Sequence, residues 1–258
     1  MTDPLFSLRD VTVRFGGLRA LNRFSMEVRP GTIHALIGPN GAGKSTVFNC
    51  ISRLYRPWSG DILFDGRSIL QTPACRISAL GIGRTFQNIE LCKGMTVLEN
   101  VLVGGAPRIP GYAAFWPSSR RTRVERDAVK AAEALLDQAG LLGDRDVRAE
   151  ELDFGHQKML DLCRALACQP RLLLLDEPAA GLRNREIAAL DALLMDLLRR
   201  RGITIVLVEH VMQLVMAVAD DITVLNFGER IAAGKPAEIR ADSKVIEAYL
   251  GKGSRAAA

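Results

Sequence analysis

Residues 32–46, TIHALIGPNGAGKST, constrain the fold more than any other part of the chain. The five residues 33–37 are mostly apolar and partly β-branched, which is typical of a buried strand. Three glycines then interrupt regular structure, and the run Lys44-Ser45-Thr46 is expected to open a helix. Strand, loop and helix in this order form the context that the phosphate-binding pattern G-x-x-x-x-G-K-[ST] requires. The sequence therefore predicts an α/β fold built around a loop that binds nucleotide phosphates.

The residue types in this loop suit phosphate binding. Glycines let backbone N–H groups turn toward phosphate oxygens, and the N-terminus of the following helix adds partial positive charge. Lys44 can reach the outer phosphates, and the Ser45 hydroxyl can ligate the magnesium ion that accompanies a nucleotide. A tight turn would explain the glycines but not Lys44 and Ser45 together. The predicted nucleotide-binding residues here are Gly38, Pro39, Asn40, Gly41, Ala42, Gly43, Lys44, Ser45 and Thr46.

Length and composition indicate one domain with subdomains. The 258 residues are 48% hydrophobic, which is enough to bury a large core. The net charge of +5 and the pI of about 9.1 are compatible with a nucleic acid or an anionic membrane as partner. However, the arginine clusters at 120–126 and 199–201 are more typical of a solvated surface or a helix end. Five cysteines without a regular framework or a signal peptide favour a reducing cytoplasm.

Alternating strands and helices are expected along most of the chain. Strands are predicted at 6–15, 21–28, 60–66, 172–175, 203–208, 222–226 and 230–233. Helices are predicted at 44 to about 54, about 124–139, about 156–167, after Asn184 as a cap, and at 243–250. Continuous apolar strands separated by helices are typical of a largely parallel sheet covered on both faces. Residues 104–122 are expected to form a surface insertion, and 251–258 a flexible tail.

The longest apolar run, residues 202–219, contains Glu209 and His210 in its middle. Ionisable groups are costly in hydrocarbon, so we expect a buried strand followed by a helix rather than a membrane span. No transmembrane segment is predicted.

Polar residues after the predicted core strands supply the remaining chemistry. Asp176 and Glu177 follow four leucines, so both carboxylates are expected at the carboxyl end of a buried strand, where α/β sheets bind ligands. Asp176 suits magnesium, and Glu177 suits a general base that polarises an attacking water. His210 follows the next strand and is expected to contact the γ-phosphate and that water, although a lone histidine is more often structural. Gln87 can bring an amide oxygen to the metal or the water.

Together these motifs resemble those of the ATP-binding-cassette (ABC) ATPases over essentially the whole chain. GPNGAGKST is similar to their Walker A motif, LLLLDEP to their Walker B motif with its catalytic glutamate, Gln87 to their Q-loop, His210 to their switch histidine and residues 179–182 to their D-loop. Phe15 lies where the family places a ring that stacks on adenine, with a core strand residue as the alternative.

One branch of the family is the most similar, that of the LivG-type ATP-binding subunits of high-affinity branched-chain amino acid importers. The similarity rests on RTFQNIELCKGMTVLENVLVG, the insertion after Gly104, LLLLDEPAAGL, VEHVMQLVM and VIEAYLG in combination.

The resemblance implies a P-loop NTPase fold for residues 1–250: a nucleotide-binding domain with a mixed or parallel core sheet, an antiparallel β subdomain and a helical subdomain at about 88–168. It implies ATP and Mg²⁺ as cofactors. The implied catalytic residues are Lys44, Glu177 and His210, the metal ligands are Ser45, Gln87 and Asp176, and further nucleotide contacts are Phe15 and Gln87. We therefore expect an ATPase.

The resemblance also implies partners. Two ATP-binding subunits are expected to close over two ATP molecules, each lying between the Walker A motif of one subunit and the signature motif of the other. A cytoplasmic coupling helix of a transmembrane permease is expected to dock in a groove near Gln87, and a periplasmic solute-binding protein to act indirectly. The chain would then lie at the cytoplasmic face of the inner membrane as a peripheral protein.

The family signature LSGGQ is altered here to Leu152, Asp153, Phe154, Gly155 and His156. An ionised Asp153 cannot donate to a partner's γ-phosphate as serine does, and at about 4 Å it would cost on the order of 4 kcal/mol per charge pair before salt screening. Alternatively, Asp153 caps its own helix. We therefore expect the chain to work best as a heterodimer with a subunit whose signature is intact. Arg183, where asparagine is frequent, leaves the D-loop contact open.

Three alternatives stay open, the first of them also in transport. The same kind of ATP-binding subunit can power the transport of another solute, such as a short-chain amide, urea or an aromatic acid. A soluble ABC protein acting on nucleic acid is disfavoured because the chain has one cassette and no sustained heptads, so no specific nucleic acid is expected. A regulatory cassette that binds ATP without hydrolysis is disfavoured by Glu177 and His210, whereas Asp153 slightly favours it.

Overall fold

Two β-sheets form the framework of the computed structural model, which describes residues 3–106 and 118–250. The larger sheet has the strand order β10-β9-β3-β8-β7-β6. Its strands are β3 (Ile33–Ile37), β6 (Ile82–Arg84), β7 (Leu172–Asp176), β8 (Thr204–Val208), β9 (Asp221–Asn226) and β10 (Glu229–Gly234). Every pairing in it is parallel except that of β9 with β10. It is therefore a mixed sheet with one antiparallel edge strand.

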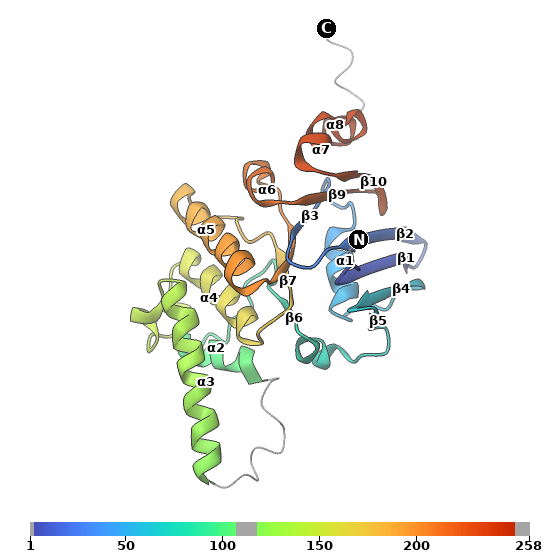
Figure 1. Cartoon of the computed structure of the whole chain (residues 1–258). Coiled ribbons are helices and arrows are strands. Elements are labelled where there is room, and N and C mark those ends of the chain that lie inside the picture. Colours follow the sequence, from blue (N-terminus) through green and yellow to red (C-terminus); the bar gives the residue numbers. More distant parts are fainter. Residues whose placement is uncertain (1–2, 107–117, 251–258) are drawn as a thin grey trace.

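The smaller sheet is antiparallel and has the order β2-β1-β4-β5. Its strands are β1 (Phe6–Phe15), β2 (Leu18–Val28), β4 (Ser59–Phe64) and β5 (Arg67–Ser68). In Figure 1 this sheet lies on one side of the larger sheet, and α2, α4 and α5 lie on the other. The helices are α1 (Lys44–Ile51), α2 (Val97–Gly105), α3 (Ser118–Gln138), α4 (Phe154–Ala167), α5 (Asn184–Arg201), α6 (Met212–Val218), α7 (Pro236–Ala241) and α8 (Ser243–Leu250).

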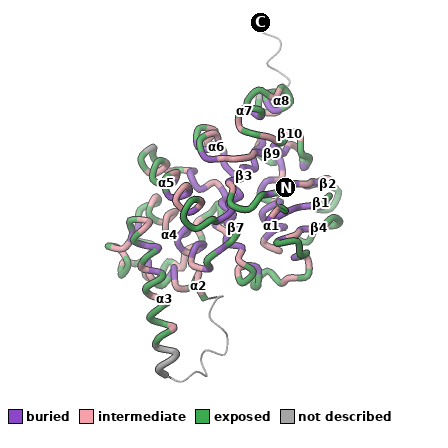
Figure 2. The backbone as a smooth tube through the Cα atoms, viewed as in Figure 1, coloured by how far each residue is buried: buried purple, intermediate pink, exposed green. Residues whose placement is uncertain are grey.

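The side chains of β7 alternate between two cores. Leu172 and Leu174 pack with α1 and the antiparallel sheet, whereas Leu173 and Leu175 pack with the helical face of α2 to α5. This alternation follows from the two-residue period of a strand, and it explains why a strand buried on both faces is leucine at four consecutive positions. Figure 2 shows the buried residues gathered along these central strands. A third cluster packs α6, α7 and α8 against β3 and β9.

The expected α/β fold with a mixed core sheet and an antiparallel sheet is confirmed. Most predicted elements are present, and several boundaries differ: β2 begins at Leu18, α1 ends at Ile51, and the helix expected from 124 begins at Ser118. The prediction that Asn184 caps its helix is wrong, because Asn184 is the first helical residue and the N-cap is Arg183, whose N–H donates to Glu186. Strands β5 and β6 and helices α2 and α7 were not predicted.

Some predictions stay untested. The helical subdomain at 88–168 corresponds to α2, α3 and α4, which contact one another but share one core with the sheet, so its boundaries remain a prediction. The expected surface insertion at 104–122 lies partly, and the expected tail at 251–258 wholly, outside the described residues. All five cysteines are free thiols. In the described ranges, no helix combines the length and the apolar character that a bilayer span requires.

Candidate functional site

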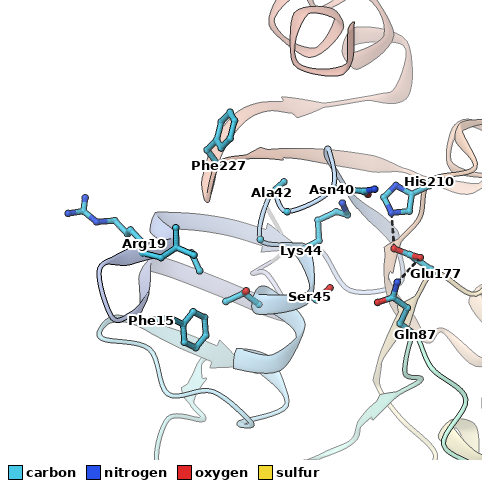
Figure 3. Close-up of a pocket in the computed structure, with 15 residues that line it drawn as sticks. Phe15, Arg19, Asn40, Ala42, Lys44, Ser45, Gln87, Glu177, His210 and Phe227 are labelled. Atoms are coloured by element: carbon cyan, nitrogen blue, oxygen red, sulfur yellow. Dashed lines mark hydrogen bonds and ion pairs between the residues drawn. The ribbon is translucent and has the colours of Figure 1, made fainter. Parts of the chain in front are cut away.

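The carboxyl ends of three adjacent parallel strands, β3, β8 and β7, bring the predicted site residues together. The phosphate loop follows β3, Glu177 follows β7, and His210 comes soon after β8. A cavity of about 880 Å³ opens at this edge of the sheet (Figure 3). Of the predicted nucleotide contacts, Phe15, Gln87 and loop residues 40–46 line it, together with Glu177 and His210.

The phosphate loop is pressed against neighbouring strands at two glycines. A Cβ added to Gly38 would lie 2.0 Å from the carbonyl oxygen of Leu225, and one added to Gly43 would lie 2.8 Å from that of Ala20. Only glycine fits at such close approaches to a backbone. The loop is therefore held between β2 and β9.

Lys44 is buried, and its ammonium group is turned back onto the loop. Its Nζ donates to the carbonyl oxygens of Gly38 at 2.7 Å and Pro39 at 2.9 Å. Burial lowers the pKa of Lys44, while the negative charges of Glu177 and Asp176 act in the opposite direction. A phosphate oxygen offers this ammonium group a stronger partner than a neutral carbonyl oxygen does, because both groups are then charged.

Glu177 is the point at which three predicted side chains meet. Its Oε2 accepts a hydrogen bond from Gln87 Nε2 at 3.1 Å, and its Oε1 lies 2.7 Å from His210 Nε2 (Figure 3). Its backbone has a φ of 51°, the left-handed region that a non-glycine residue seldom adopts. The Glu177 N–H donates to Val208 at 2.8 Å, which ties the ends of β7 and β8 together.

Asp176 does not line the cavity. It is buried, its Oδ2 lies 3.4 Å from Arg84 Nη2, and its Oδ1 has no hydrogen-bond partner. Burial raises the pKa of Asp176, and the Arg84 guanidinium opposes that shift. A buried carboxylate oxygen without a partner is the kind of acceptor that a hydrated cation satisfies.

The site fits magnesium only if a nucleotide supplies further oxygens. In the described part of the chain, no three His, Cys, Asp or Glu side chains cluster as a metal site. Mg²⁺ is normally held by one or two carboxylates, water and substrate phosphates, which matches Asp176 and the Ser45 hydroxyl at the cavity wall.

Phe15 is not a core residue, so that alternative is wrong. Its side chain is 45% exposed and lines the cavity. Its ring meets that of Tyr55 edge-to-face, with centroids 5.1 Å apart. The Tyr55 ring thus steadies Phe15 at the cavity wall.

The altered signature residues 152–156 do not line this cavity. Asp153 is the N-cap of α4 and accepts from the His156 N–H at 2.9 Å, so the capping alternative is confirmed. That N–H also does most to lower the pKa of Asp153, which favours its charged form. The Phe154 ring packs on Gly181, where an added Cβ would lie 2.6 Å from its Cε1 atom.

Several residues of the site were not found by sequence reasoning. The cavity wall also includes Leu18, Arg19, Ala20 and Phe227. Phe227 is 86% exposed at the turn between β9 and β10, and the next N–H, that of Gly228, donates to Ala42 in the phosphate loop at 2.9 Å. This contact joins segments far apart in the chain, so no local pattern could have indicated it.

The chain is similar to known proteins in sequence and in fold. A family model described as "ABC transporter" matches residues 21–180, and one described as "Branched-chain amino acid ATP-binding cassette transporter" matches residues 229–254. The chain is 41% identical to the high-affinity branched-chain amino acid transport ATP-binding protein LivG of Salmonella typhimurium, over 98% of this chain and all of that protein.

Two solved structures are similar in fold. A nucleotide-free ATP-binding cassette from an ABC transporter has a TM-score of 0.84 and 29% identity, over 96% of this chain and 100% of that one. A dimeric ATP-binding cassette bound to ADP and Pi, in a post-hydrolysis state, has a TM-score of 0.76 and 26% identity, over 90% and 98%. The chain therefore belongs to the ABC transporter ATP-binding family, whose cassettes hydrolyse ATP to power transport.

Proposed function

We propose that this chain is the ATP-hydrolysing subunit of an importer for branched-chain amino acids. The observation that supports this chemistry is that Gln87 and His210 both contact Glu177 in the cavity that the Lys44 loop lines. The match of residues 229–254 to a branched-chain amino acid cassette family, and the similarity to LivG, support this solute class.

The chain's own residues can perform each part of the hydrolysis. The loop N–H groups and Lys44 bind the β- and γ-phosphates once the Lys44 ammonium group leaves the Gly38 and Pro39 carbonyls. Glu177 accepts a proton from the water that attacks the γ-phosphorus, and the bond from that phosphorus to the bridging oxygen of ADP breaks. His210 and Gln87 hold the Glu177 carboxylate in place, and Phe15 packs on the adenine ring.

Magnesium, held by Ser45 and by Asp176 directly or through water, would neutralise charge on the phosphates. Gln87 is its third proposed ligand, which requires its side-chain oxygen to face the ion while its Nε2 stays near Glu177.

We further propose that the chain works with a second ATP-binding subunit, with a heterodimer favoured, and with transmembrane permease subunits. The dimeric cassette of similar fold supports pairing. The heterodimer is supported by Asp153, whose negative charge stands at the start of α4, where a signature motif would meet the partner's ATP. A periplasmic solute-binding protein would act indirectly, and the chain would lie at the cytoplasmic face of the inner membrane.

The test is Mg²⁺-dependent ATP hydrolysis by the purified chain, alone and assembled with its permease, for wild type and Glu177→Gln. We expect permease to raise turnover, and Glu177→Gln to lower it by at least 100-fold while ATP still binds. Leucine uptake by proteoliposomes tests the solute. Tight ATP binding without turnover in any assembly would contradict the ATPase role, and turnover without leucine, isoleucine or valine uptake would contradict the solute.

A further inference from the structure

One lysine outside the cavity contacts the backbone of Glu177, the proposed base. Lys158, in the second turn of α4, donates from Nζ to the carbonyl oxygen of Glu177 at 2.8 Å. That carbonyl oxygen also accepts the Ala180 N–H at 3.2 Å. None of the motifs considered above assigns a role to Lys158.

The backbone that Lys158 holds is strained. The φ of 51° at Glu177 is unfavourable for a residue with a Cβ, and such a conformation persists only where the surroundings determine it. The Glu177 N–H is fixed by Val208, and the Glu177 carbonyl is fixed by Lys158 and Ala180. The direction of the carboxylate toward Gln87 and His210 depends on this backbone.

The lysine is itself well placed to act as a fixed donor. It is half-buried, and its Nζ lies 5.7 Å from the centre of the Phe154 ring. Burial lowers the pKa of Lys158, and nearby negative charges oppose that shift, namely those of Glu209, Asp161, Glu177 and Asp176. Phe154 in turn packs on Gly181, just after the loop that begins at Glu177. The first two turns of α4 therefore contact the segment 177–181 at two points.

From these contacts we infer that Lys158 is a positioning residue for Glu177: it holds the strained 177–180 turn so that the carboxylate faces Gln87 and His210. This inference rests on the proposed role of Glu177 as base. Lys158 touches neither the cavity nor the reacting atoms, so its loss is expected to reduce the rate of hydrolysis and not the binding of ATP.

The test compares Lys158→Met, whose side chain is one atom shorter and cannot donate, with Lys158→Arg, which can donate. In the assembled transporter we expect Lys158→Met to lower kcat about tenfold with KM for ATP within twofold, and Lys158→Arg to retain at least half of kcat. The matched control is Lys235→Met, because Lys235 also donates to a backbone carbonyl, that of Asp220 at 2.9 Å, on a distant surface. We expect it to leave kcat within twofold of wild type.

Amide hydrogen exchange of the peptide covering residues 177–182 supplies a readout that needs no turnover. We expect exchange at least fivefold faster in Lys158→Met and unchanged in Lys158→Arg and Lys235→Met. If Lys158→Met does not fold, Lys158→Gln replaces it, because glutamine stays polar without the charge and its amide ends one atom short of the position of the lysine Nζ.

If the wild type is active, the inference would be overturned by an unchanged kcat in a folded Lys158→Met or Lys158→Gln protein. A fall in kcat accompanied by a rise in KM for ATP would overturn it as well. An inactive wild type would instead refute the proposed function, and exchange of the 177–182 peptide would still decide whether Lys158 holds the turn.

Discussion

The carboxylate of Glu177 is engaged by two side chains, and its backbone N–H and carbonyl are engaged as well. A side chain held in this way loses little further freedom when a nucleotide binds. Preorganised groups of this kind cost no rearrangement at the moment of reaction. The strained φ at Glu177 is therefore consistent with a residue selected for orientation rather than for stability.

Substitutions of Asp153 can separate the effect of its charge from the effect of its helix cap, because serine, asparagine and aspartate are all good N-caps. Asp153→Ser and Asp153→Asn keep the cap that binds the His156 N–H and remove the negative charge. If the charge weakens the site that holds the partner's ATP, both variants should raise ATPase activity of the assembled transporter several-fold, measured as phosphate release. Asp153→Ala, which removes charge and cap, should lower the free energy of unfolding by about 1 kcal/mol. No rise in either capped variant would remove the basis for a preferred heterodimer.

His34 makes stability depend on pH. It lies buried in β3, its Nε2 is 2.8 Å from Thr223 Oγ1, and burial lowers its pKa from 6.5 to about 4. The unfolded chain takes up a proton at this residue below pH 6.5 and the folded chain does not, so stability is complete above that pH and is lost as the pH falls toward 4. Between pH 7 and 5 the loss attributable to His34 is about 2 kcal/mol.

Urea unfolding of wild type and His34→Gln at pH 7, 6 and 5 measures this loss. Glutamine does not titrate and can still bind Thr223, so its curve should be flatter by about that amount. Burial raises the pKa values of Asp161 and Asp176, which makes the folded state more stable at low pH, the opposite of the His34 effect. Both proteins contain these two residues, so their contribution cancels when the two pH profiles are compared. Parallel pH profiles would show that His34 is not the cause.

Among the helices, α2 and α4 approach closely at Gly104. A Cβ there would lie 2.1 Å from the carbonyl oxygen of Arg164, whereas one at Gly105 would lie 3.5 Å from that of Ala167, an ordinary contact. Gly104→Ala should therefore lower the free energy of unfolding by about 1–3 kcal/mol through overpacking. Gly105→Ala should change it by less than about 0.5 kcal/mol, because the new methyl group meets only ordinary contacts. Urea titration of both proteins checks the difference, and equal values would show that the helices separate without cost.

Helices and strands were predictable where consecutive residues decide them. The apolar runs of β3, β7 and β8 and the loop before α1 carry their own signals. By contrast, β6 is three residues long and is a strand only because it pairs with β7. Helix α2 was not predicted, although it has a local signal in the capping box of Thr96 and Glu99.

The site residues also divide into those that a local sequence pattern indicates and those that only the packing brings together. Glu177, His210 and Gln87 belong to short motifs at strand ends, so their meeting could be expected from the sheet alone. Phe227 and Lys158 reach the site through contacts between distant segments, Gly228 with Ala42 and α4 with the turn after β7. No spacing in the chain indicates such contacts, because they depend on how the sheets and helices pack.

On the scale of the whole molecule, one further hollow on the described surface has a volume of about 460 Å³ and is separate from the nucleotide cavity. Cys75, Phe86, Glu90 and Arg164 are among the residues that line it. Phe86 and Glu90 flank Gln87 in sequence, so we propose this hollow as the groove near Gln87 in which the permease coupling helix is expected to dock. An element docked there would contact the segment that carries Gln87 to Glu177.

Cys75 reports on that docking, because it is exposed in the hollow whereas Cys50, Cys163 and Cys168 are buried. Burial raises the pKa values of Cys50 and Cys163 to about 12, so these thiols react slowly. In a Cys92→Ser background, we expect maleimide to label Cys75 rapidly in the free chain and at least tenfold more slowly in the assembled transporter. Ser243→Cys, at an exposed position of α8, should label equally in both states. Equal rates at Cys75 would place the permease elsewhere, and slowing at both positions would indicate general shielding rather than docking in this groove.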